Sequence, residues 1–477
     1  MRKSSLHIFL LILFSFVFET KAQDAHYWTE QYGTKSMLLS NSVVGSVSDL
    51  GAVFYNPGRL GLIENPAFVI SAKVHQLSNT KFENATGDNK DLKKSKFGSA
   101  PSLVAGTFKV KWLPGHKFAY SFLTRNSSDT DFATRNQVHG DVIEGFVGEE
   151  YFSGSMRIGK KFKEEWMGVT WSKVLGEKAS VGISGFFSTR NQSSNLETRL
   201  QAFTQDEILE MYHAKNSYSF KQYGLVFKAG FAYEWEKVRI GTTMTSPTIP
   251  IAGDGDFYYE QFNTGYLSNN AIYELDSQGG IDAIYKTPWA VALGLGVDVF
   301  TAGTLHFSSE YYGNVDPYAI MQAEPFVGQS TGKEWDARVV NQLNSVINFG
   351  VGYNFRINDK IGGYLSYSTD FSAAQTKYSA AEARESLAYI GSTFKSDVQH
   401  FAFGVLMDLS WADITLGATN ASANYEVPRP IDFPDGEVDA VDILSSDEMA
   451  EIDWSRWRFI VGISIPFISQ IADKLNL

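Results

Sequence analysis

The sequence predicts an all-β fold: an antiparallel transmembrane β-barrel of 14 strands with an N-terminal hatch, or plug, in its lumen. Three observations predict it. Apolar residues alternate with small or polar ones along many segments, short and long connections alternate between these segments, and an export signal is followed by no apolar run long enough for a membrane-spanning helix. A chain that lives in a membrane without such helices must close its backbone hydrogen bonds in a barrel.

The alternation has the period of two that is typical of a β-strand whose two faces meet different surroundings. It is clearest in the segments 222–235, 289–299, 346–357 and 456–467, where every second residue is apolar. A soluble β-sandwich also alternates. Against the sandwich, aromatic residues stand at the ends of the apolar faces, as in the girdle of a membrane barrel, and the opposite faces are long and rich in glycine.

The connections between these segments count the strands. Six links are tight: 113–115, 175–177, 234–237, 301–303, 358–359 and 410–412. Seven are long and polar: 83–99, 128–164, 193–217, 263–284, 314–344, 372–396 and 427–454. Six short and seven long connections join 14 strands. Because outer-membrane barrels have short periplasmic turns and long outer loops, an even strand count places both termini in the periplasm.

The N-terminus predicts the compartment. Arg2 and Lys3 precede an apolar run from Leu6 to Phe18. Thr20 and Ala22 then place small residues at the −3 and −1 positions of a cleavage site, so residues 1–22 are interpreted as a secretory signal peptide. A membrane anchor helix would need roughly 20 apolar residues, and this run is shorter. The predicted location is the outer membrane of a Gram-negative cell.

Composition excludes several classes of protein. The chain contains no Cys, which excludes disulfides, thiolate metal sites and a lipid anchor on cysteine. It carries 41 Lys and Arg against 53 Asp and Glu, so we expect no nucleic acid partner. No zinc-protease, serine-hydrolase or nucleotide-binding motif is present, and the sequence predicts neither an enzyme nor a cofactor.

The predicted domains follow the alternation. Residues 23–66 do not alternate and contain scattered glycines, so we expect a hatch that fills the lumen of a barrel formed by residues 67–467. Residues 468–477 are expected to form a short periplasmic helix. Phe467, the last apolar residue of the final strand, resembles the terminal aromatic of the outer-membrane assembly signal, so the barrel assembly machinery is an expected partner.

The stretch from Ser46 to Leu60, with Asp49 and the run Asn56-Pro57-Gly58, resembles the hatch signature of the FadL/OmpP1/TodX family of outer-membrane transporters. Thr245-Ser246-Pro247 and the segment 287–294 also match that family, which has Ala where this chain has Gly58. The resemblance implies passive uptake of hydrophobic compounds, such as long-chain fatty acids or aromatic hydrocarbons. It assigns hatch and gating roles to Asp49, Phe54, Asn56, Pro57 and Gly58.

The family's ligands leave sideways through a gap at a kinked third strand. Strand 3 of this chain, 116–125, contains no Gly or Pro that would predict a kink. We expect the turn at Asn56 and Pro57 to hold the hatch against the strand-3 wall, with a purely structural turn as the alternative. The expected partners are a hydrophobic ligand, outer-membrane lipids and lipopolysaccharide. A rival function is that of a scaffold or shuttle barrel in a protein secretion system.

The remaining polar and apolar groups each allow two interpretations. His306, Ser308 and Glu310 are expected to share the inward face of one strand, where they either line the lumen or form a hydrolase site. Neighbouring members of this set lie about 7 Å apart along the strand, which is too far for a direct hydrogen bond. The acidic segment 431–455 is a solvated loop or a Ca²⁺ site. A short helix expected at 205–213 serves loop packing or ligand capture, through the four residues Phe203, Ile208, Leu209 and Met211. The inward charges form a selective pore, or they pair with each other and with the hatch: Lys109, Lys111, Lys228, Asp298, Glu310, Arg356, Asp408, Arg456 and Arg458.

Overall fold

The computed structural model describes residues 26–63, 68–143, 146–264, 271–299, 303–373, 388–390, 396–409, 412–435, 443–444 and 448–465. The predicted signal peptide, the predicted C-terminal helix and Phe467 lie outside these residues.

Fourteen strands form a ring in which each strand pairs antiparallel with the next. In order, the strands are β1 (Phe68–Glu83), β2 (Leu92–Phe108), β3 (His116–Gly140), β4 (Glu150–Leu175), β5 (Ala179–Phe203), β6 (Leu209–Trp235), β7 (Val238–Thr245), β10 (Ala290–Val299), β11 (Gly303–Tyr312), β16 (Val346–Asn358), β17 (Ile361–Asp370), β19 (Val398–Asp408), β20 (Asp413–Pro428) and β21 (Met449–Ile465). The ring closes because β21 pairs with β1 and β5 pairs with β6. The predicted barrel and its strand count are confirmed.

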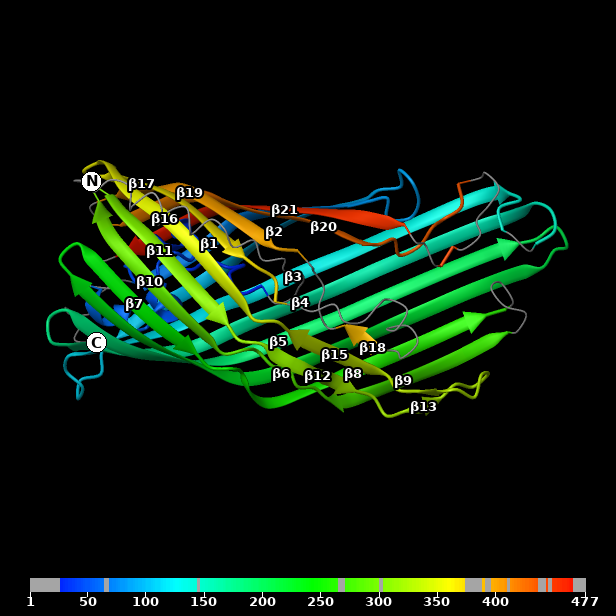
Figure 1. Cartoon of the computed structure of the whole chain (residues 1–477), viewed down its shortest axis with the longest axis horizontal. Coiled ribbons are helices and arrows are strands. Elements are labelled where there is room, and N and C mark those ends of the chain that lie inside the picture. The colour runs from blue at the N-terminus through cyan, green and yellow to red at the C-terminus, as the bar shows by residue number, and fades with distance from the viewer. Residues whose placement is uncertain are drawn as a thin grey trace, which may run out of the picture.

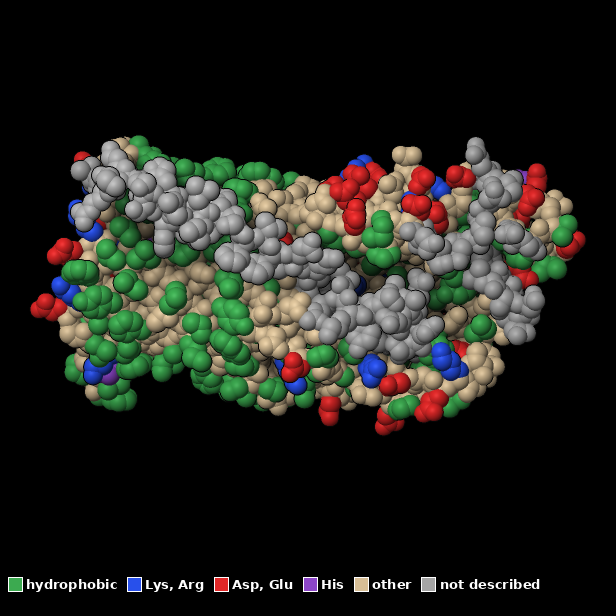
Figure 2. Space-filling model, viewed as in Figure 1, with side chains coloured by type: hydrophobic (Ala, Val, Ile, Leu, Met, Phe, Trp, Pro, Cys, Tyr) green, Lys and Arg blue, Asp and Glu red, His purple; other side chains and the backbone are tan. Residues whose placement is uncertain are grey.

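Large apolar side chains cover the outward face of the barrel in the half that contains the tight links. They include Phe227, Phe231, Leu293, Phe307, Phe349 and Phe403, all more than one third exposed. Figure 2 shows this apolar surface over one half of the molecule, whereas charged side chains gather on the other half. An apolar band of this kind is the surface that lipid requires of a membrane barrel.

The outer part of the molecule contains more strand than the sequence predicted. Strands β3 to β6 are each 25 to 27 residues long and continue well beyond the short strands β7, β10 and β11 (Figure 1). The strands β8 (Ile249–Asn263) and β9 (Ile272–Asp282) extend the sheet from β6, so the expected connections 128–164, 193–217 and 263–284 are largely strands. The remaining strands belong to outer loops: β12 (Val315–Gln322), β13 (Phe326–Val327), β14 (Glu334–Trp335), β15 (Arg338–Leu343) and β18 (Ala388–Ile390).

The prediction of a short helix at 205–213 is wrong. The segment between Phe203 and Leu209 is a tight turn, and Leu209 pairs with Phe203 at the tip of the β5–β6 hairpin. The pairing of β5 and β6 runs from Ala179 and Tyr233 to this tip, and that long hydrogen-bonded ladder outweighs the weak helical periodicity of a few residues.

The N-terminal segment fills the lumen between the tight links and the middle of the barrel, as predicted (Figure 1). It contains three short helices, η1 (Ser36–Leu39), α2 (Ala52–Tyr55) and α3 (Arg59–Leu62). Their apolar side chains form the largest buried cluster of the structure together with inward residues of the wall such as Leu103, Leu123 and Phe186. In the described part of the chain, no helix is long and apolar enough to cross a membrane.

Candidate functional site

Asp49 organises the hatch from within. Its carboxylate accepts hydrogen bonds from the amides of Thr34, Lys35 and Ser36 at 2.7–2.9 Å, from the Ser36 hydroxyl at 2.8 Å and from the Gly51 amide at 2.9 Å. Charge-assisted bonds of this kind are stronger than those between neutral groups. The loop at 33–36 and the start of α2 are therefore held by one buried side chain.

The turn at Asn56, Pro57 and Gly58 contacts the wall formed by β5, β6 and β7. Asn56 Nδ2 donates to the carbonyl of Phe231 at 3.0 Å and to that of Val44 at 2.9 Å, and its Oδ1 accepts from the Gly58 amide. The expectation that this turn rests on the strand-3 wall is wrong. Inward glycines of β5 to β7 let the hatch backbone approach here, because a side chain would collide with it.

Those glycines belong to a belt around the inside of the wall. A Cβ added to Gly182 would lie 2.3 Å from the Pro57 carbonyl oxygen, and one added to Gly294 would lie 2.2 Å from the Gly45 nitrogen. Other inward glycines face hatch atoms in the same way, including Gly230, Gly241, Gly352 and Gly417. The glycine-rich face that the alternation revealed therefore serves the close approach of the hatch.

Tyr32 and Phe54 are hatch residues whose side chains pack at strand β3, and the hatch carbonyls of His26 and Ile63 also accept hydrogen bonds from the β3 residues Asn126 and Lys117. The Tyr32 hydroxyl donates to the carbonyl oxygens of Thr124 at 2.9 Å and Arg125 at 3.3 Å, and the Tyr32 side chain is fully buried. The Phe54 ring packs 4.4 Å from the Tyr32 ring, and the Arg125 guanidinium lies 5.5 Å from it. Of the residues assigned a gating role, Phe54 lies closest to the strand that the resemblance singles out.

Strand β3 carries a β-bulge at this point. Thr124 pairs with Glu165 and Asn126 with Glu164, so Arg125 is the extra residue. The pairing between β2 and β3 runs from Phe108 and Phe118 to Leu103 and Leu123, and in the described residues it goes no further, although both strands continue outward. We call this separation of the two strands the β2–β3 split.

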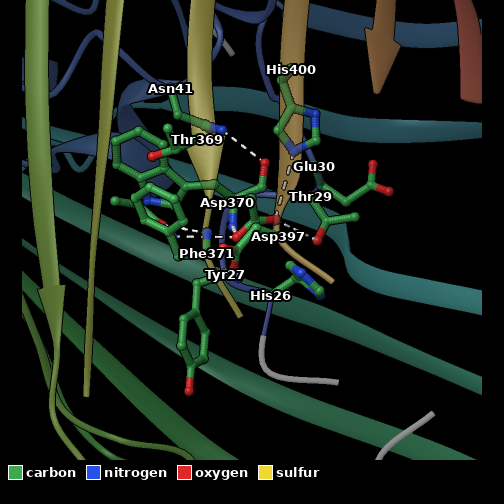
Figure 3. Close-up of polar contacts among 12 residues, drawn as sticks. His26, Tyr27, Thr29, Glu30, Asn41, Thr369, Asp370, Phe371, Asp397 and His400 are labelled. Atoms are coloured by element: carbon green, nitrogen blue, oxygen red, sulfur yellow. Dashed lines mark hydrogen bonds and ion pairs between the residues drawn. The ribbon is translucent and has the colours of Figure 1, made fainter. Parts of the chain in front are cut away.

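The first residues of the described hatch are anchored on the opposite wall. Asp370 at the end of β17 accepts hydrogen bonds from the amides of Tyr27 and Trp28 at 2.8 and 2.9 Å and from the Thr29 hydroxyl, with His400 Nε2 3.7 Å away (Figure 3). Arg456 and Arg458 both donate to the Thr29 carbonyl. Two buried cations and one buried carboxylate of the wall thus hold the segment from Tyr27 to Glu30.

A cavity of about 310 Å³ lies beside this anchored segment, on its outer side. His26 and Thr29 of the hatch contribute to it, and its walls come from β1, β3, β4, β19, β20 and β21. Six large apolar side chains line it: Phe82, Phe132, Ile158, Phe162, Ile452 and Trp454. Residues of β1 and β3 line the cavity, and none of the described side chains of β2 between them does, so the cavity reaches the β2–β3 split.

A second pocket of about 60 Å³ adjoins the cavity, with His26 and Asn126 lining both. The bulge directs Arg125 into this pocket, next to Trp166, Tyr285 and Tyr312. Within the described residues, Arg125 Nη1, Tyr27 Oη and Thr245 Oγ1 are buried without a hydrogen-bond partner. Three unsatisfied polar atoms in one small pocket indicate room for water or for a polar group of a ligand.

Most of the inward charges follow the paired interpretation. Lys228 lies 3.8 Å from Glu310, Arg239 pairs with Asp298 at 2.8 Å, and Arg458 pairs with Glu30 of the hatch. Four of the residues expected inside are instead exposed at strand ends, namely Lys109, Lys111, Arg356 and Asp408. Lys109 and Lys111 follow the last residue of β2, and Arg356 and Asp408 are among the last residues of β16 and β19. At these ends of the wall a side chain reaches solvent whichever face the period of two assigns to it.

His306, Ser308 and Glu310 each bind the hatch. His306 Nδ1 lies 2.6 Å from the Ser46 hydroxyl, Ser308 accepts from the Val44 amide at 3.0 Å, and Glu310 accepts from the Trp28 indole at 2.8 Å. Arg59 of the hatch pairs with Glu234 of strand β6 at 2.5 Å. Burial lowers the pKa of the Arg59 guanidinium, and the Glu234 carboxylate opposes that effect.

The residues expected to capture ligand lie far from the cavity. Phe203, Ile208 and Leu209 are about half exposed at the outer tip of the β5–β6 hairpin, with Met211 beside them, and none of the four lines the cavity. Their capture role stays a prediction. The acidic segment 431–455 is not a simple solvated loop, because Ile431 and Phe433 are buried and β21 begins at Met449. The candidate Ca²⁺ ligands of this segment are Asp435, Glu437 and Asp439, of which the last two lie outside the described residues, so this interpretation stays a prediction.

Sequence reasoning missed Tyr32, Arg125 and Asp370. Tyr32 and Asp370 each stand among other polar residues in the sequence, and nothing in their local pattern distinguishes them. Arg125 could have been noticed as a charge placed directly after the inward apolar residues of strand 3, where the alternation changes its phase.

No protein-family model and no curated protein sequence matches the chain. Solved structures do. The Pseudomonas putida toluene transporter TodX superposes with a TM-score of 0.52 at 13% identity, covering 93% of this chain and 100% of that one. A Pseudomonas aeruginosa FadL homologue gives 0.53 at 10% identity over 93% and 100% of the two chains, and the CymD monoaromatic hydrocarbon channel gives 0.51 at 9% over 92% and 99%. The chain therefore has the fold of the FadL and TodX structures.

Proposed function

We propose that this protein is an outer-membrane channel for the passive passage of hydrophobic small molecules. A ligand occupies the cavity on the outer side of the hatch and leaves sideways through the β2–β3 split into the bilayer. Three features support the proposal: the apolar outer band, the fold shared with a toluene transporter and a monoaromatic hydrocarbon channel, and the plugged lumen.

The observation that carries the proposal is the position of the split relative to the cavity. Pairing between β2 and β3 stops at Leu103 and Leu123, and the apolar cavity lies directly beyond this point between β1 and β3. An apolar solute gains free energy when it leaves water for lipid, so a sideways path needs no energy source. The hatch blocks the alternative path along the lumen, because its residues from Trp28 to Leu60 are mostly buried against the wall.

The pocket at Arg125 favours a ligand with an acidic or strongly polar group. The two carboxylates nearest to it already have cations, since Glu164 pairs with Arg190 at 3.0 Å and Glu310 with Lys228. Arg125 forms no ion pair with a described residue. A ligand carboxylate in the small pocket would form an ion pair with Arg125. The adjoining cavity would hold the apolar part of the ligand, since its volume is about twice that of a cavity that holds benzene.

A crosslink across the split tests the path. The chain contains no Cys, so Lys96→Cys with Asp129→Cys creates a single pair, at two side chains that form an ion pair between β2 and β3. We expect oxidation, or a short bis-thiol reagent, to lower uptake of a labelled hydrophobic substrate in a deletion strain that expresses this variant. Reduction should restore it.

A matched control comes from the next strand pair. Asp131 and Arg157 form a similarly exposed ion pair at 3.0 Å, but they join β3 to β4, which pair on both sides of the bulge, from His116 to Gly140 of β3. Crosslinking Asp131→Cys with Arg157→Cys should leave uptake unchanged. Equal uptake by the two crosslinked variants would contradict a sideways exit.

The ligand class is tested by Arg125→Met. A hydrogen bond between charged groups contributes about 1.5–3 kcal/mol, so uptake of a long-chain carboxylate should fall about tenfold or more, whereas uptake of toluene should change little. Arg239→Met, which removes a cation paired with Asp298 outside the cavity, serves as the control. An equal effect on the two substrates would refute the acidic-ligand proposal and leave the channel proposal intact.

A further inference from the structure

The segment Arg429–Asp435, which we call the strap, crosses the outer end of the cavity. It follows β20 directly, and its residue Pro430 lines the cavity together with Pro428. Two of its side chains point inward: Ile431 is fully buried and Phe433 is 3% exposed. The strap belongs to the segment that the sequence presents as an acidic surface loop, and the channel function does not require its buried residues.

On one side, the strap is bound to the connection between β1 and β2. The Phe433 amide donates to the Thr86 carbonyl at 3.0 Å, and Lys90 Nζ donates to the Phe433 carbonyl at 2.8 Å. The Arg429 guanidinium is almost fully buried and pairs with Asp88 at 2.6 Å and with Asp432 of the strap at 2.8 Å. These contacts attach the strap to the strand pair on one edge of the β2–β3 split.

On the other side, the strap is bound to β3 and β4. Asn136 Nδ2 donates to the Pro434 carbonyl at 2.7 Å. The Phe433 ring lies over Gly154, where an added Cβ would be 2.4 Å from a ring carbon, and it packs 6.4 Å from the Phe152 ring. The glycine thus makes a seat for the ring on the inner face of β4. These contacts attach the same short segment to the opposite edge of the split.

We infer that the strap closes the outer mouth of the cavity and ties the two edges of the β2–β3 split together, so that its release both admits a ligand and loosens the exit. The statement that release of the strap admits a ligand rests on the proposed function, whereas the contacts that close the cavity and join the two edges do not depend on it. Phe433 is the anchor, since the burial of a large aromatic ring makes the largest single contribution to such a contact. Arg429 is the polar latch, because it joins the β1–β2 connection to the strap itself.

Access to the cavity tests the inference without any transport assay. Thr130, which lines the cavity, is changed to Cys in the cysteine-free chain, and the rate of its reaction with a bulky membrane-impermeant maleimide is measured on intact cells. Phe433→Ala in this background should raise the rate severalfold, and Arg429→Gln should raise it by a smaller factor. Phe326→Ala is the matched control, because Phe326 packs on Tyr259 in another outer loop away from the cavity.

A second measurement addresses the split. Disulfide formation between Lys96→Cys and Asp129→Cys should slow when Phe433→Ala is added, because the two edges separate more often. Each variant is compared as a folded, heat-modifiable barrel; if Phe433→Ala does not assemble, Arg429→Gln decides the question. Unchanged labelling at position 130 would overturn the strap as a closure, and an unchanged disulfide rate would overturn its role as a clamp. If labelling rises as expected but hydrophobic uptake is absent from every variant and from the parent, the channel function fails and the strap remains.

Discussion

The hatch meets the barrel wall in two different ways. Towards β5, β6, β7 and β10 its backbone lies directly on inward glycines, and backbone groups such as the Val44 amide and the Val53 carbonyl bond to serines of the wall. Towards β3 no described glycine of the strand receives the hatch backbone, and every contact uses a side chain, either Tyr32 and Phe54 of the hatch or Asn126 and Lys117 of β3. The strand is bulged beside Tyr32.

The difference indicates which side of the hatch can move. Close backbone packing on glycine has no room for adjustment, because any shift opens voids or causes collisions. Side-chain contacts can rearrange by changing rotamers while the backbone stays in place. We therefore expect the β5 to β10 side to determine stability, and the β3 side to determine how readily the exit opens.

The largest effect is expected from a side chain placed in the glycine belt. Gly294→Val would put Cβ 2.2 Å from the Gly45 nitrogen, so the hatch could not dock without a backbone shift. Overpacking of this kind costs about 1–3 kcal/mol or more, and we expect a clear drop in the temperature at which the barrel loses its resistance to detergent. Gly159→Val on β4, whose Cβ would have no neighbour closer than 3.6 Å and none in the hatch, should change that temperature little.

A smaller effect is expected from the turn on the same side. Asn56→Ala with Pro57→Ala removes the hydrogen bonds to Val44, Phe231 and Gly58, each of which contributes about 1 kcal/mol. If the β5 to β10 side of the hatch determines stability, this double substitution should lower thermal stability and change uptake per folded barrel little. The gating role that the resemblance assigns to these residues predicts the reverse, a stable barrel with reduced uptake, so the ratio of the two measurements separates the interpretations.

The smallest stability effect is expected on the β3 side. Tyr32→Phe removes only the hydroxyl that binds the Thr124 and Arg125 carbonyls, a change of about 1 kcal/mol. The barrel should melt close to the parent, yet hydrophobic uptake should change severalfold because the hatch no longer holds the bulge. Uptake equal to the parent in a correctly inserted barrel would remove β3 from the mechanism and with it the contrast between the two sides.

The ring of 14 strands, its tight links and the position of the hatch in the lumen can all be predicted from the amino-acid sequence alone. The reason is physical: lipid on one face and a packed lumen on the other impose an alternation that can be read residue by residue, as at Ile347 to Ile357, and the hatch is the segment without it. The sequence predicts loops where β3 to β6 extend outward, because the outward face of these extensions is polar and the contrast that marks a membrane strand disappears there.

The contacts between these parts follow from the folded barrel and could not be predicted from the sequence. The bulge at Arg125 contains no Gly or Pro, and it is held by a tyrosine 93 residues away in the sequence. The Asn56 turn could have rested on any wall of the barrel, and the inward glycines of β5 to β7 that receive it look in sequence like those of every other strand. Phe433 lies in a strongly acidic segment, yet it is buried because Gly154 on a distant strand leaves space for its ring. Each of these contacts depends on which residues the closed barrel brings face to face, and a local pattern carries no information about a partner that is distant in the chain.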